Sequence, residues 1–390
     1  MKEENVIPET KRFLLVTHTF ATGPSQELRD YFVNKQFDFA FLEHPLIYTP
    51  LMVRSKITFF FKGKVKKITE GVDSKHIFFL HFISDFFYTL YFIINAKQEY
   101  DVCVAVDNLN FLASFILKKL GFCKKLIYWT IDYTPKRFEN VILNTIYHGV
   151  DRFCCYNSDV VWNSSKRMKE ARRHNGVNTA KCAPEIIVPD GSHFKEIERM
   201  PSWKADRFKL VFMGHLIKKK GVDLVISSLP ELLRDYPQLT LTIIGTGDEE
   251  NALKELARKL NVADKVFFMG YIEDHKNVER IIANCGIGLA PYVPDPNSFT
   301  FFSDVGKVKI YLACGLPVLI TNVPEIASDL QKEKAGIVFE YNKQSFVINL
   351  KELLDNEKKY LYYRNNAVRF IENLSWDRIF DEALAKSRDL

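Results

Sequence analysis

The stretch FFSDVGKVKIYLACGLPVLIT, residues Phe301–Thr321, contains a helix, the end of that helix and a buried strand in immediate succession. Polar residues and Gly306 lead into a short amphipathic helix, which is expected to end at Gly315 and Pro317. The apolar run Val318–Thr321 that follows is typical of a strand in the middle of a parallel sheet. A helix followed directly by a buried strand predicts an α/β fold.

Two lysines, Lys307 and Lys309, fall in the first turn of this helix. The helix macrodipole places partial positive charge at that end, so two cations are unfavourable there by themselves. One explanation is that an anion such as a phosphate binds at this end, held by the lysines together with free backbone N–H groups. The other is that both side chains are simply hydrated. The helix alone leaves both explanations open.

The residues on either side extend the alternation of strands and helices in both directions. In the second half of the chain, the expected strands are 208–214, 239–247, 265–272, 286–292 and 316–321. In the first half, they are 13–20, 37–43, 100–107 and 125–132. Strands that alternate with helices form parallel, doubly wound sheets. We therefore predict two Rossmann-like domains that face a central cleft, with the ligand beyond the carboxyl ends of the strands.

Composition is that of a folded protein of two or three domains, since the 390 residues are 47% hydrophobic and 26% charged. The net charge of +6 is modest and does not by itself indicate a nucleic-acid partner, for which no recognition motif is present. Seven cysteines, an odd number, show no metal-type spacing and suit a reduced compartment. The sequence therefore predicts no metal site.

The N-terminus, MKEENVIPETKR, is too charged for a secretory signal, so we expect a cytoplasmic protein. The segment Ile77–Ala96 approaches the length of a membrane span. Asp85 near its middle, together with His81 and Ser84, makes spanning costly. A buried helix or a helix on the membrane surface is the favoured interpretation.

Loops at the expected strand ends of the second half have compositions that suit a nucleotide. Glycines permit close approach of the backbone, lysines suit phosphates, and backbone atoms at one strand end could bind a base edge. Each of these signals is weak alone, because lysine-rich loops are usually solvated and glycines often follow strands. The residues concerned are Gly214, His215, Lys218–Lys220, Gly245, Gly247, Tyr271 and Ile272.

Together, the order and spacing of these segments are specific. From about Phe208 to the C-terminus, the chain resembles the nucleotide-sugar-binding domain of GT-B glycosyltransferases, in particular the large, mostly retaining family of group 1 (family 4-like) enzymes. The segments VFMGHLIKKKGVDLVISSL, LTLTIIGTGDEENALKELARKL, VFFMGYI, CGIGLAPY and GKVKIYLACGLPVLITNVPEI follow the order usual in that family. SWDRIFDEALA resembles the last helix, which crosses back to the first domain in such enzymes. The first half resembles the family only in layout.

This resemblance sets the expected domain boundaries. The first, acceptor- and membrane-facing domain is expected to span residues 1–196, and a charged linker follows at 197–207. The nucleotide-sugar-binding domain is expected at 208–372 and the C-terminal helix at 373–390.

The resemblance also answers the question raised by the first turn of the helix. In many members of the family, a lysine at the position of Lys307 contacts the donor diphosphate, and Lys220 matches a phosphate-binding lysine. His215 stands where the family usually has Arg, so diphosphate affinity would depend more on the lysines. The strand-end glycines and other residues named above, together with Gly306, are further predicted donor contacts. Asp304 is included because it could replace an acid that the family usually carries nearby. The predicted donor-binding residues are Gly23, Gly214, His215, Lys220, Gly245, Gly247, Tyr271, Ile272, Asp304, Gly306 and Lys307.

One departure from the family concerns the ribose contact. The family commonly has two acidic residues separated by seven others, and the second hydrogen-bonds the nucleotide ribose. Counted back from Gly315, these positions hold Phe302 and Ile310. An aliphatic side chain cannot accept the hydroxyl proton, and Asp304, Asp295 or Glu325 could supply the contact instead. We interpret the chain as a divergent enzyme rather than an inactive one.

In the first half, three loops at strand ends hold candidate residues. The Gly-Pro turn at Gly23, with Ser25 and Gln26, corresponds in layout to the GT-B loop near the donor phosphates, although a structural turn explains it equally well. Asp132 follows a strand and could orient an acceptor hydroxyl or act as a base, or could merely cap a helix. Asp107 and Asn110 carry the same ambiguity. The predicted catalytic residues are Asp132, Lys220 and Lys307.

The segment 54–67 is rich in lysine and phenylalanine and indicates which kind of acceptor the protein could use. Its rings could insert at the headgroup level of a membrane while its lysines meet anionic lipid. Alternatively, the phenylalanines belong to the core and the lysines cover them. The predicted membrane contacts are Phe59, Phe60, Phe61, Lys62, Lys64, Lys66 and Lys67.

These observations predict a metal-independent glycosyltransferase of the hexosyltransferase type at the inner face of the cell membrane. It would move a sugar, with retention, from a nucleotide-diphosphate sugar, with UDP favoured, to a hydroxyl on a lipid-linked or glycan acceptor such as a polysaccharide precursor. No further cofactor is expected. Two alternatives remain open: a nucleotide-sugar epimerase, and a catalytically silent subunit that binds a nucleotide or a partner enzyme.

Overall fold

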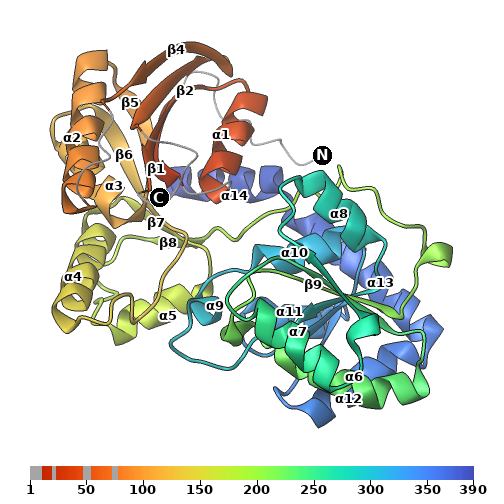
Figure 1. The fold of residues 1–390 in the computed structure, drawn as a ribbon. Coiled ribbons are helices and arrows are strands. Elements are labelled where there is room, and N and C mark those ends of the chain that lie inside the picture. The colour runs from red at the N-terminus through yellow and green to blue at the C-terminus, as the bar shows by residue number, and fades with distance from the viewer. Residues whose placement is uncertain (1–10, 20–22, 47–53, 73–77) are drawn as a thin grey trace. The chain divides into compact units, whose positions relative to one another are not determined.

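The computed structural model describes residues 11–19, 23–46, 54–72 and 78–390. It divides into two compact units, one made of Met1–Pro189 with Trp376–Leu390 and the other of Asp190–Ser375. Each unit is built around its own sheet (Figure 1).

The first unit contains a sheet of eight strands, with the order β4-β3-β2-β1-β5-β6-β7-β8. Its strands are β1 (Arg12–Thr19), β2 (Asp38–Pro45), β3 (Lys56–Phe61), β4 (Lys64–Glu70), β5 (Tyr100–Val106), β6 (Cys123–Thr130), β7 (Val160–Asn163) and β8 (Glu185–Ile187). Its helices are α1 (Pro24–Asn34), α2 (Phe78–Ala96), α3 (Asp107–Lys119), α4 (Val141–Asn157), α5 (Lys166–His174) and α14 (Trp376–Asp389).

Six strands of this sheet are parallel, and β3 and β4 form an antiparallel hairpin on its edge. Leu15 of β1 pairs with Phe41 of β2 on one side and with Val104 of β5 on the other. The hairpin turns at Lys62 and Gly63, which both have positive φ (47° and 71°), as a tight two-residue turn requires. The alternation of strands and helices did not predict this hairpin.

Apolar side chains cover both faces of the first sheet. On one face, α2, α3 and α4 pack over residues such as Val16 and Leu126. On the other, Phe32 of α1 stacks on Phe13 with ring centres 4.6 Å apart, and Phe380 of α14 contacts Trp129. The C-terminal helix is therefore part of the first unit.

The second unit contains a parallel sheet of six strands, with the order β11-β10-β9-β12-β13-β14. Its strands are β9 (Lys209–Met213), β10 (Thr240–Ile244), β11 (Val266–Gly270), β12 (Ile287–Ala290), β13 (Val318–Thr321) and β14 (Gly336–Phe339). Its α-helices are α6 (Val222–Asp235), α7 (Glu250–Lys259), α8 (His275–Ala283), α9 (Phe299–Phe302), α10 (Gly306–Ala313), α11 (Ile326–Lys332), α12 (Lys343–Leu354) and α13 (Glu357–Ile371). Short 3-10 helices are η1 (Ser202–Lys204), η2 (Lys218–Lys220), η3 (Ala263–Lys265) and η4 (Glu372–Leu374).

Helices cover both faces of the second sheet, α6, α7 and α12 on one and α8, α10 and α11 on the other. Residues Phe301–Thr321 form α10 and β13 as predicted, and Gly315 ends the helix with φ 81°. The prediction of two doubly wound α/β domains is confirmed.

Within the described residues, no helix meets the length and hydropathy needed to cross a bilayer. The same part of the chain contains no group of three or more His, Cys, Asp or Glu side chains arranged to hold a metal ion.

Candidate functional site

The two lysines in the first turn of α10 have different environments. Lys309 is buried, with 1% of its surface exposed, and its ammonium group donates to the Asp304 carboxylate and to the Asp190 carbonyl. The backbone N–H of Asp190 donates to the same carboxylate at 2.8 Å. Lys309 and Asp304 therefore neutralise each other's charge. Their hydrogen bonds to the Asp190 backbone hold residue 190 against α10.

Lys307 makes no ion pair with any described residue. Its ammonium group lies against the backbone of Gly214, where a Cβ atom would come within 2.6 Å of Nζ. Burial lowers the pKa of Lys307. The loop after β9 therefore contacts the first turn of α10 through the Lys307 ammonium group. Because Gly214 has no side chain, there is room for this ammonium group beside its backbone.

Lys220 is the second cation of this region and is 7% exposed. Its ammonium group lies 4.8 Å from the Tyr292 ring centre and 5.1 Å from that of Phe299, and 3.4 Å from Thr300 Oγ1. Burial, and then the like charge of Lys307, lower the pKa of Lys220 to about 8. No described carboxylate pairs with it, so the buried Lys220 and the half-buried Lys307 lie near each other without a counter-ion among the described residues.

Glycines after β9 and β10 bring successive loops together at the carboxyl edge of the sheet. The N–H of Gly214 donates to the Ile244 carbonyl at 2.8 Å, and Gly245, with φ 125°, leaves no room for a Cβ because the Gly214 carbonyl would lie 2.1 Å from it. Gly247 packs as closely on Leu216. These glycines thus allow the loops after β9 and β10 to pack on each other, and the approach of a ligand to this backbone stays a prediction.

Other predicted donor contacts lie around this edge. His215 is exposed, and Gly306 lies beside the Asp190 carboxylate, 3.2 Å from the position of an added Cβ. After β11, Tyr271 is 75% exposed and Ile272 packs on the apolar cluster under α10. The structure brings Lys220, Lys307, Gly214, Gly245 and Gly247 together, but it gives Tyr271 no contact with them.

The positions where the resemblance predicts acids are apolar here. Phe302 is 7% exposed, and Ile310 packs on the cluster under α10. Among the substitutes, Asp304 pairs with Lys309, and Asp295 pairs with Lys219 at 2.7 Å. Glu325 directly precedes α11. Both aspartates are thus already engaged by lysines.

The residues that surround Lys220 were not predicted from the sequence. Tyr292 places its ring on the ammonium group, and Thr300 offers its hydroxyl from α9. Ser298 caps α9 by accepting from the Thr300 N–H. The Ser-x-Thr pattern after a turn is a helix-start signal that could have located α9, but no local signal shows that α9 packs on Lys220.

In the first unit, the Gly23 loop forms a helix cap. The Gly23 N–H donates to Gln26 Oε1 at 3.1 Å, and Ser25 donates to the same oxygen. The residues just before it, 20–22, lie outside the described residues. Asp107 begins α3 with φ 67°, and the Asn110 amide is buried against His18.

Asp132 is exposed on the loop between β6 and α4. Two side chains of α4, one turn apart, hold this loop. Asn144 accepts from the Arg137 and Phe138 N–H groups at 2.9 and 3.2 Å, and His148 Nε2 donates to the Pro135 carbonyl at 2.7 Å.

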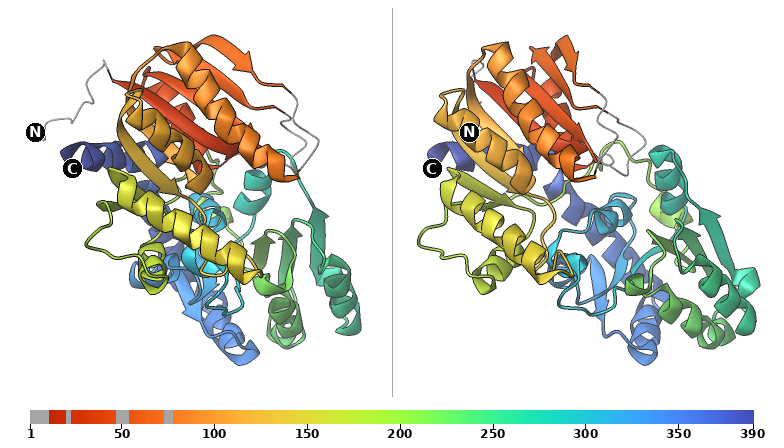
Figure 2. Two further views of the ribbon diagram at one scale, coloured as in Figure 1. Left: turned by 90° about the vertical axis from the view of Figure 1, so that its left-hand side faces the viewer. Right: turned by 60° about the vertical axis from the view of Figure 1, so that its left-hand side comes forward.

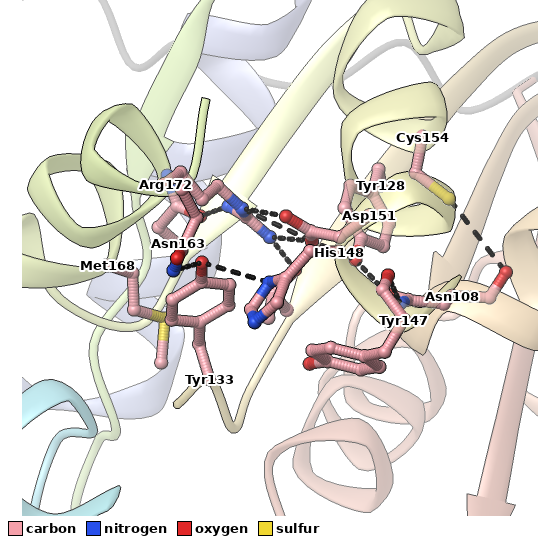
Figure 3. Close-up of polar contacts among 12 residues, drawn as sticks. Asn108, Tyr128, Tyr133, Tyr147, His148, Asp151, Cys154, Asn163, Met168 and Arg172 are labelled. Atoms are coloured by element: carbon pink, nitrogen blue, oxygen red, sulfur yellow. Dashed lines mark hydrogen bonds and ion pairs between the residues drawn. The ribbon is translucent and has the colours of Figure 1, made fainter. Parts of the chain in front are cut away.

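A buried ion pair between Arg172 and Asp151 lies near Tyr133 of this loop (Figure 3). Arg172 of α5 donates from Nε and Nη2 to the Asp151 carboxylate at 2.9 and 2.8 Å, and both residues are 1% exposed. The guanidinium also donates to Asn163, while Tyr128 donates its hydroxyl to Asp151 at 2.7 Å. Tyr133, the residue after Asp132, places its ring on the guanidinium. The pair thus supports the start of the Asp132 loop.

The predicted membrane residues lie on the β3–β4 hairpin. Phe60 stacks on Phe39 with ring centres 4.2 Å apart, and Phe59 packs on the core. Phe61 is 51% exposed, and the ammonium groups of Lys62 and Lys66 lie over its ring. Lys64 and Lys67 are exposed as well. Of the three rings, Phe61 is therefore the one exposed to an outside partner.

Comparisons with known proteins agree with this fold. Residues 207–356 match the family Glycosyl transferases group 1. An uncharacterized glycosyltransferase of Methanocaldococcus jannaschii is 26% identical over 252 residues, 61% of this chain and 62% of that protein. One subunit of human phosphatidylinositol N-acetylglucosaminyltransferase is 28% identical over 159 residues, 40% of this chain and 31% of that protein. The chain thus spans less than two thirds of these relatives.

A solved structure covers nearly the whole chain. Anabaena HepE, determined in complex with UDP, superposes with a TM-score of 0.70 over 97% of this chain and 100% of that one, at 13% identity. Two parallel-sheet α/β domains with this superposition define the GT-B fold. The chain has that fold, and residues 207–356 within it are similar to the group 1 glycosyltransferases.

Proposed function

We propose that the protein transfers a sugar from a UDP-sugar to a hydroxyl group. The observation that carries the proposal is a pair of neighbouring cations, the buried Lys220 and the half-buried Lys307, without carboxylate partners among the described residues, with Lys307 beside the Gly214 backbone. Such a site favours an anion, because an anion would relieve the repulsion between the two charges. HepE, similar in fold, was solved with UDP, which supports a uridine diphosphate here.

The same residues account for the chemistry of the leaving group. Breaking the bond between the sugar and the diphosphate places negative charge on the departing oxygen. Ammonium groups fixed in advance stabilise such charge, and the free N–H groups at the start of α10 add to the effect. We therefore propose transfer without a metal cofactor, and transfer with retention rests on the resemblance to the family.

The acceptor proposed is a lipid-linked or glycan hydroxyl at the inner face of the cell membrane, in polysaccharide precursor synthesis. Two observations support it. The basic hairpin presents exposed lysines that suit anionic lipid, and one relative belongs, by its name, to a phosphatidylinositol N-acetylglucosaminyltransferase. Asp132, on its exposed loop, is the proposed group that orients the acceptor hydroxyl.

UDP is expected to raise the melting temperature of the purified protein, because a ligand that binds only the native state stabilises it. Thermal unfolding with UDP, GDP, ADP and dTDP measures this directly. A shift with UDP at least as large as with the other three supports the donor assignment. A folded protein that shows no shift with any of them contradicts it.

Replacing Lys220 with methionine is expected to stabilise the unliganded protein and to abolish the UDP shift. The Lys220 pKa is about 8 in the native state, below the value of an unfolded lysine, so burial of the charged form costs on the order of 2–3 kcal/mol at pH 7. Between about pH 8 and pH 10.5 the unfolded state binds more protons, so the free energy of unfolding of the natural protein should rise with pH.

Urea unfolding at pH 7 and pH 9.5 checks this expectation. The natural protein should gain stability between the two values, and Lys220→Met should gain less. Lys219→Met is the matched control, because the exposed Lys219 already pairs with Asp295. A Lys220→Met protein that still shows the full UDP shift would remove Lys220 from the donor site.

A second candidate function is a silent subunit that binds a nucleotide or a partner enzyme without transferring sugar. The observation that favours it is the apolar character of Phe302 and Ile310, the two positions where related enzymes carry acids. A UDP shift without turnover of any UDP-sugar, tested with membrane extracts as acceptor, would favour this alternative.

A further inference from the structure

Three helices form one outer layer of the first unit. α2 packs against α3, and α3 packs against α4, over one face of the eight-stranded sheet. In the left view of Figure 2 this layer faces the reader, with α2 in orange and α4 in yellow. The side of the layer that points away from the sheet is called the outer helical face below.

In α4, polar side chains lie on the inner side beside the core residues Cys154 and Cys155, and apolar side chains lie on the opposite side. The polar residues Asn144, His148 and Asp151 point inward, where they hold the Asp132 loop and Arg172. Ile142 and Ile146, one turn apart, are 71% and 57% exposed. A helix in water normally buries its apolar stripe and exposes its polar one.

The inner side of α2 likewise combines polar side chains with apolar ones, Phe92 and Ile93. Asp85 and Thr89, one turn apart, are 3% and 1% exposed and point toward the sheet. Asp85 lies 3.4 Å from His18 Nε2 of β1, and Thr89 lies 2.8 Å from a ring nitrogen of His44 in β2. Its opposite side carries an exposed stripe at helical spacing, namely Ile83, Phe87, Tyr91 and Ile94.

α3 completes the layer between them. Asn108, Asn110 and Ser114 are buried, whereas Leu109 and Ile116 are 38% and 37% exposed. All three helices thus carry buried polar groups on their inner side and large apolar side chains on the outer helical face. Because a contiguous exposed apolar patch is unfavourable in water, a layer built in this way indicates an apolar partner.

Charge on the layer distinguishes a lipid partner from others. On the described residues of these helices, Asp107 is the one exposed acid, and it lies at the start of α3 beside the carboxyl edge of the sheet. At the other end of α3, Lys119 is exposed and makes no ion pair with a described residue, and Arg152 of α4, half-buried beside Gly176, makes none either. Apolar side chains bordered by such cations match the interface of a bilayer that contains anionic lipid.

We propose that the outer helical face of α2, α3 and α4 docks on the surface of a lipid bilayer that contains anionic headgroups. The helices lie in the plane of the interface, since none of the described helices is long and apolar enough to cross it. This inference rests on the proposed function in that a lipid-linked acceptor requires contact with a membrane. It assigns that contact to the helices, with the hairpin lysines as a secondary, electrostatic contribution.

Sedimentation of the full-length protein with vesicles tests the proposal. Vesicles of phosphatidylcholine mixed with phosphatidylglycerol are expected to bind the protein more tightly than vesicles of phosphatidylcholine alone. The double variant Phe87→Gln with Ile142→Gln should bind the mixed vesicles at least tenfold more weakly, because it removes two exposed apolar side chains from different helices. Both positions are more than half exposed, so the variant should melt at the temperature of the natural protein.

Two matched variants separate this surface from others. Ile348→Gln with Tyr362→Gln changes residues of similar exposure, 54% and 56%, in the second unit and should bind vesicles like the natural protein. Lys64→Gln with Lys66→Gln on the hairpin should weaken binding less than the helix variant, and only at low salt.

Each outcome decides for or against the proposal. Equal vesicle binding by the helix variant and the natural protein overturns it, as does a natural protein that binds no vesicles. Dimerisation of the natural protein that the helix variant abolishes, measured by sedimentation velocity, also overturns it by assigning the face to a second copy. The UDP shift is measured on the same samples, so vesicle binding without a shift leaves this inference standing while the donor proposal fails.

Discussion

Replacing Lys307 with alanine is expected to lower turnover at least tenfold without unfolding the protein. Its ammonium group lies against the Gly214 backbone and makes no ion pair with the described residues, so its removal breaks no structural contact of that kind. Removal of one fixed charge or donor from a developing oxyanion commonly costs about 10²–10³ in turnover. Since burial disfavours this cation, the melting temperature should not fall.

Steady-state kinetics with a UDP-sugar separate the two ways in which Lys307 could act. A fall in kcat shows that Lys307 stabilises charge in the transition state, whereas a rise in KM with constant kcat shows that it binds donor and transition state equally. Activity near that of the natural protein would exclude Lys307 from the mechanism.

Lys309→Ala is the matched control, because it removes a cation two residues away in the same turn. Lys309 is buried between the Asp304 carboxylate and the Asp190 carbonyl. Its loss leaves a buried carboxylate without its cation, so this variant should lose stability, and its melting temperature should fall. A stable Lys307→Ala protein beside a destabilised Lys309→Ala protein would establish that the two lysines have different roles.

Lys307 and Lys309 show which structural features the sequence alone predicts and which it does not. The pattern of Phe301–Thr321 was sufficient to predict α10, its glycine end and β13, because each depends on residues close in sequence. It could not tell which lysine is neutralised, since the partner carbonyl of Lys309 comes from Asp190, 119 residues away. Pairing between distant segments leaves no local signal.

The first unit shows the same limit. The β3–β4 hairpin was missed, although Lys62-Gly63 between two strand-like runs is a turn signal. The exposed apolar side chains of α4 were also missed. Ile142 and Ile146 look like an ordinary core stripe until it is known that Asn144, His148 and Asp151 face the sheet and the Asp132 loop. Periodicity finds the two sides of a helix but does not tell which one is buried.

Replacing Arg172 with methionine is expected to destabilise the first unit by about 3–5 kcal/mol, because it leaves the Asp151 carboxylate buried without its cation. Of the hydrogen bonds that Asp151 accepts in Figure 3, the one from the Tyr128 hydroxyl would remain. Urea unfolding followed by tryptophan fluorescence measures the change, since Trp129 and Trp162 are buried in this unit.

The double variant Arg172→Met with Asp151→Leu distinguishes loss of the ion pair from loss of packing. Both residues are 1% exposed, so an apolar pair avoids the cost of a lone buried charge. We expect the double variant to be more stable than Arg172→Met alone by more than about 1 kcal/mol, the coupling typical of charges in one network. If the double variant is as unstable as the two single changes summed, the guanidinium acts mainly by packing between the Tyr128 and Tyr133 rings.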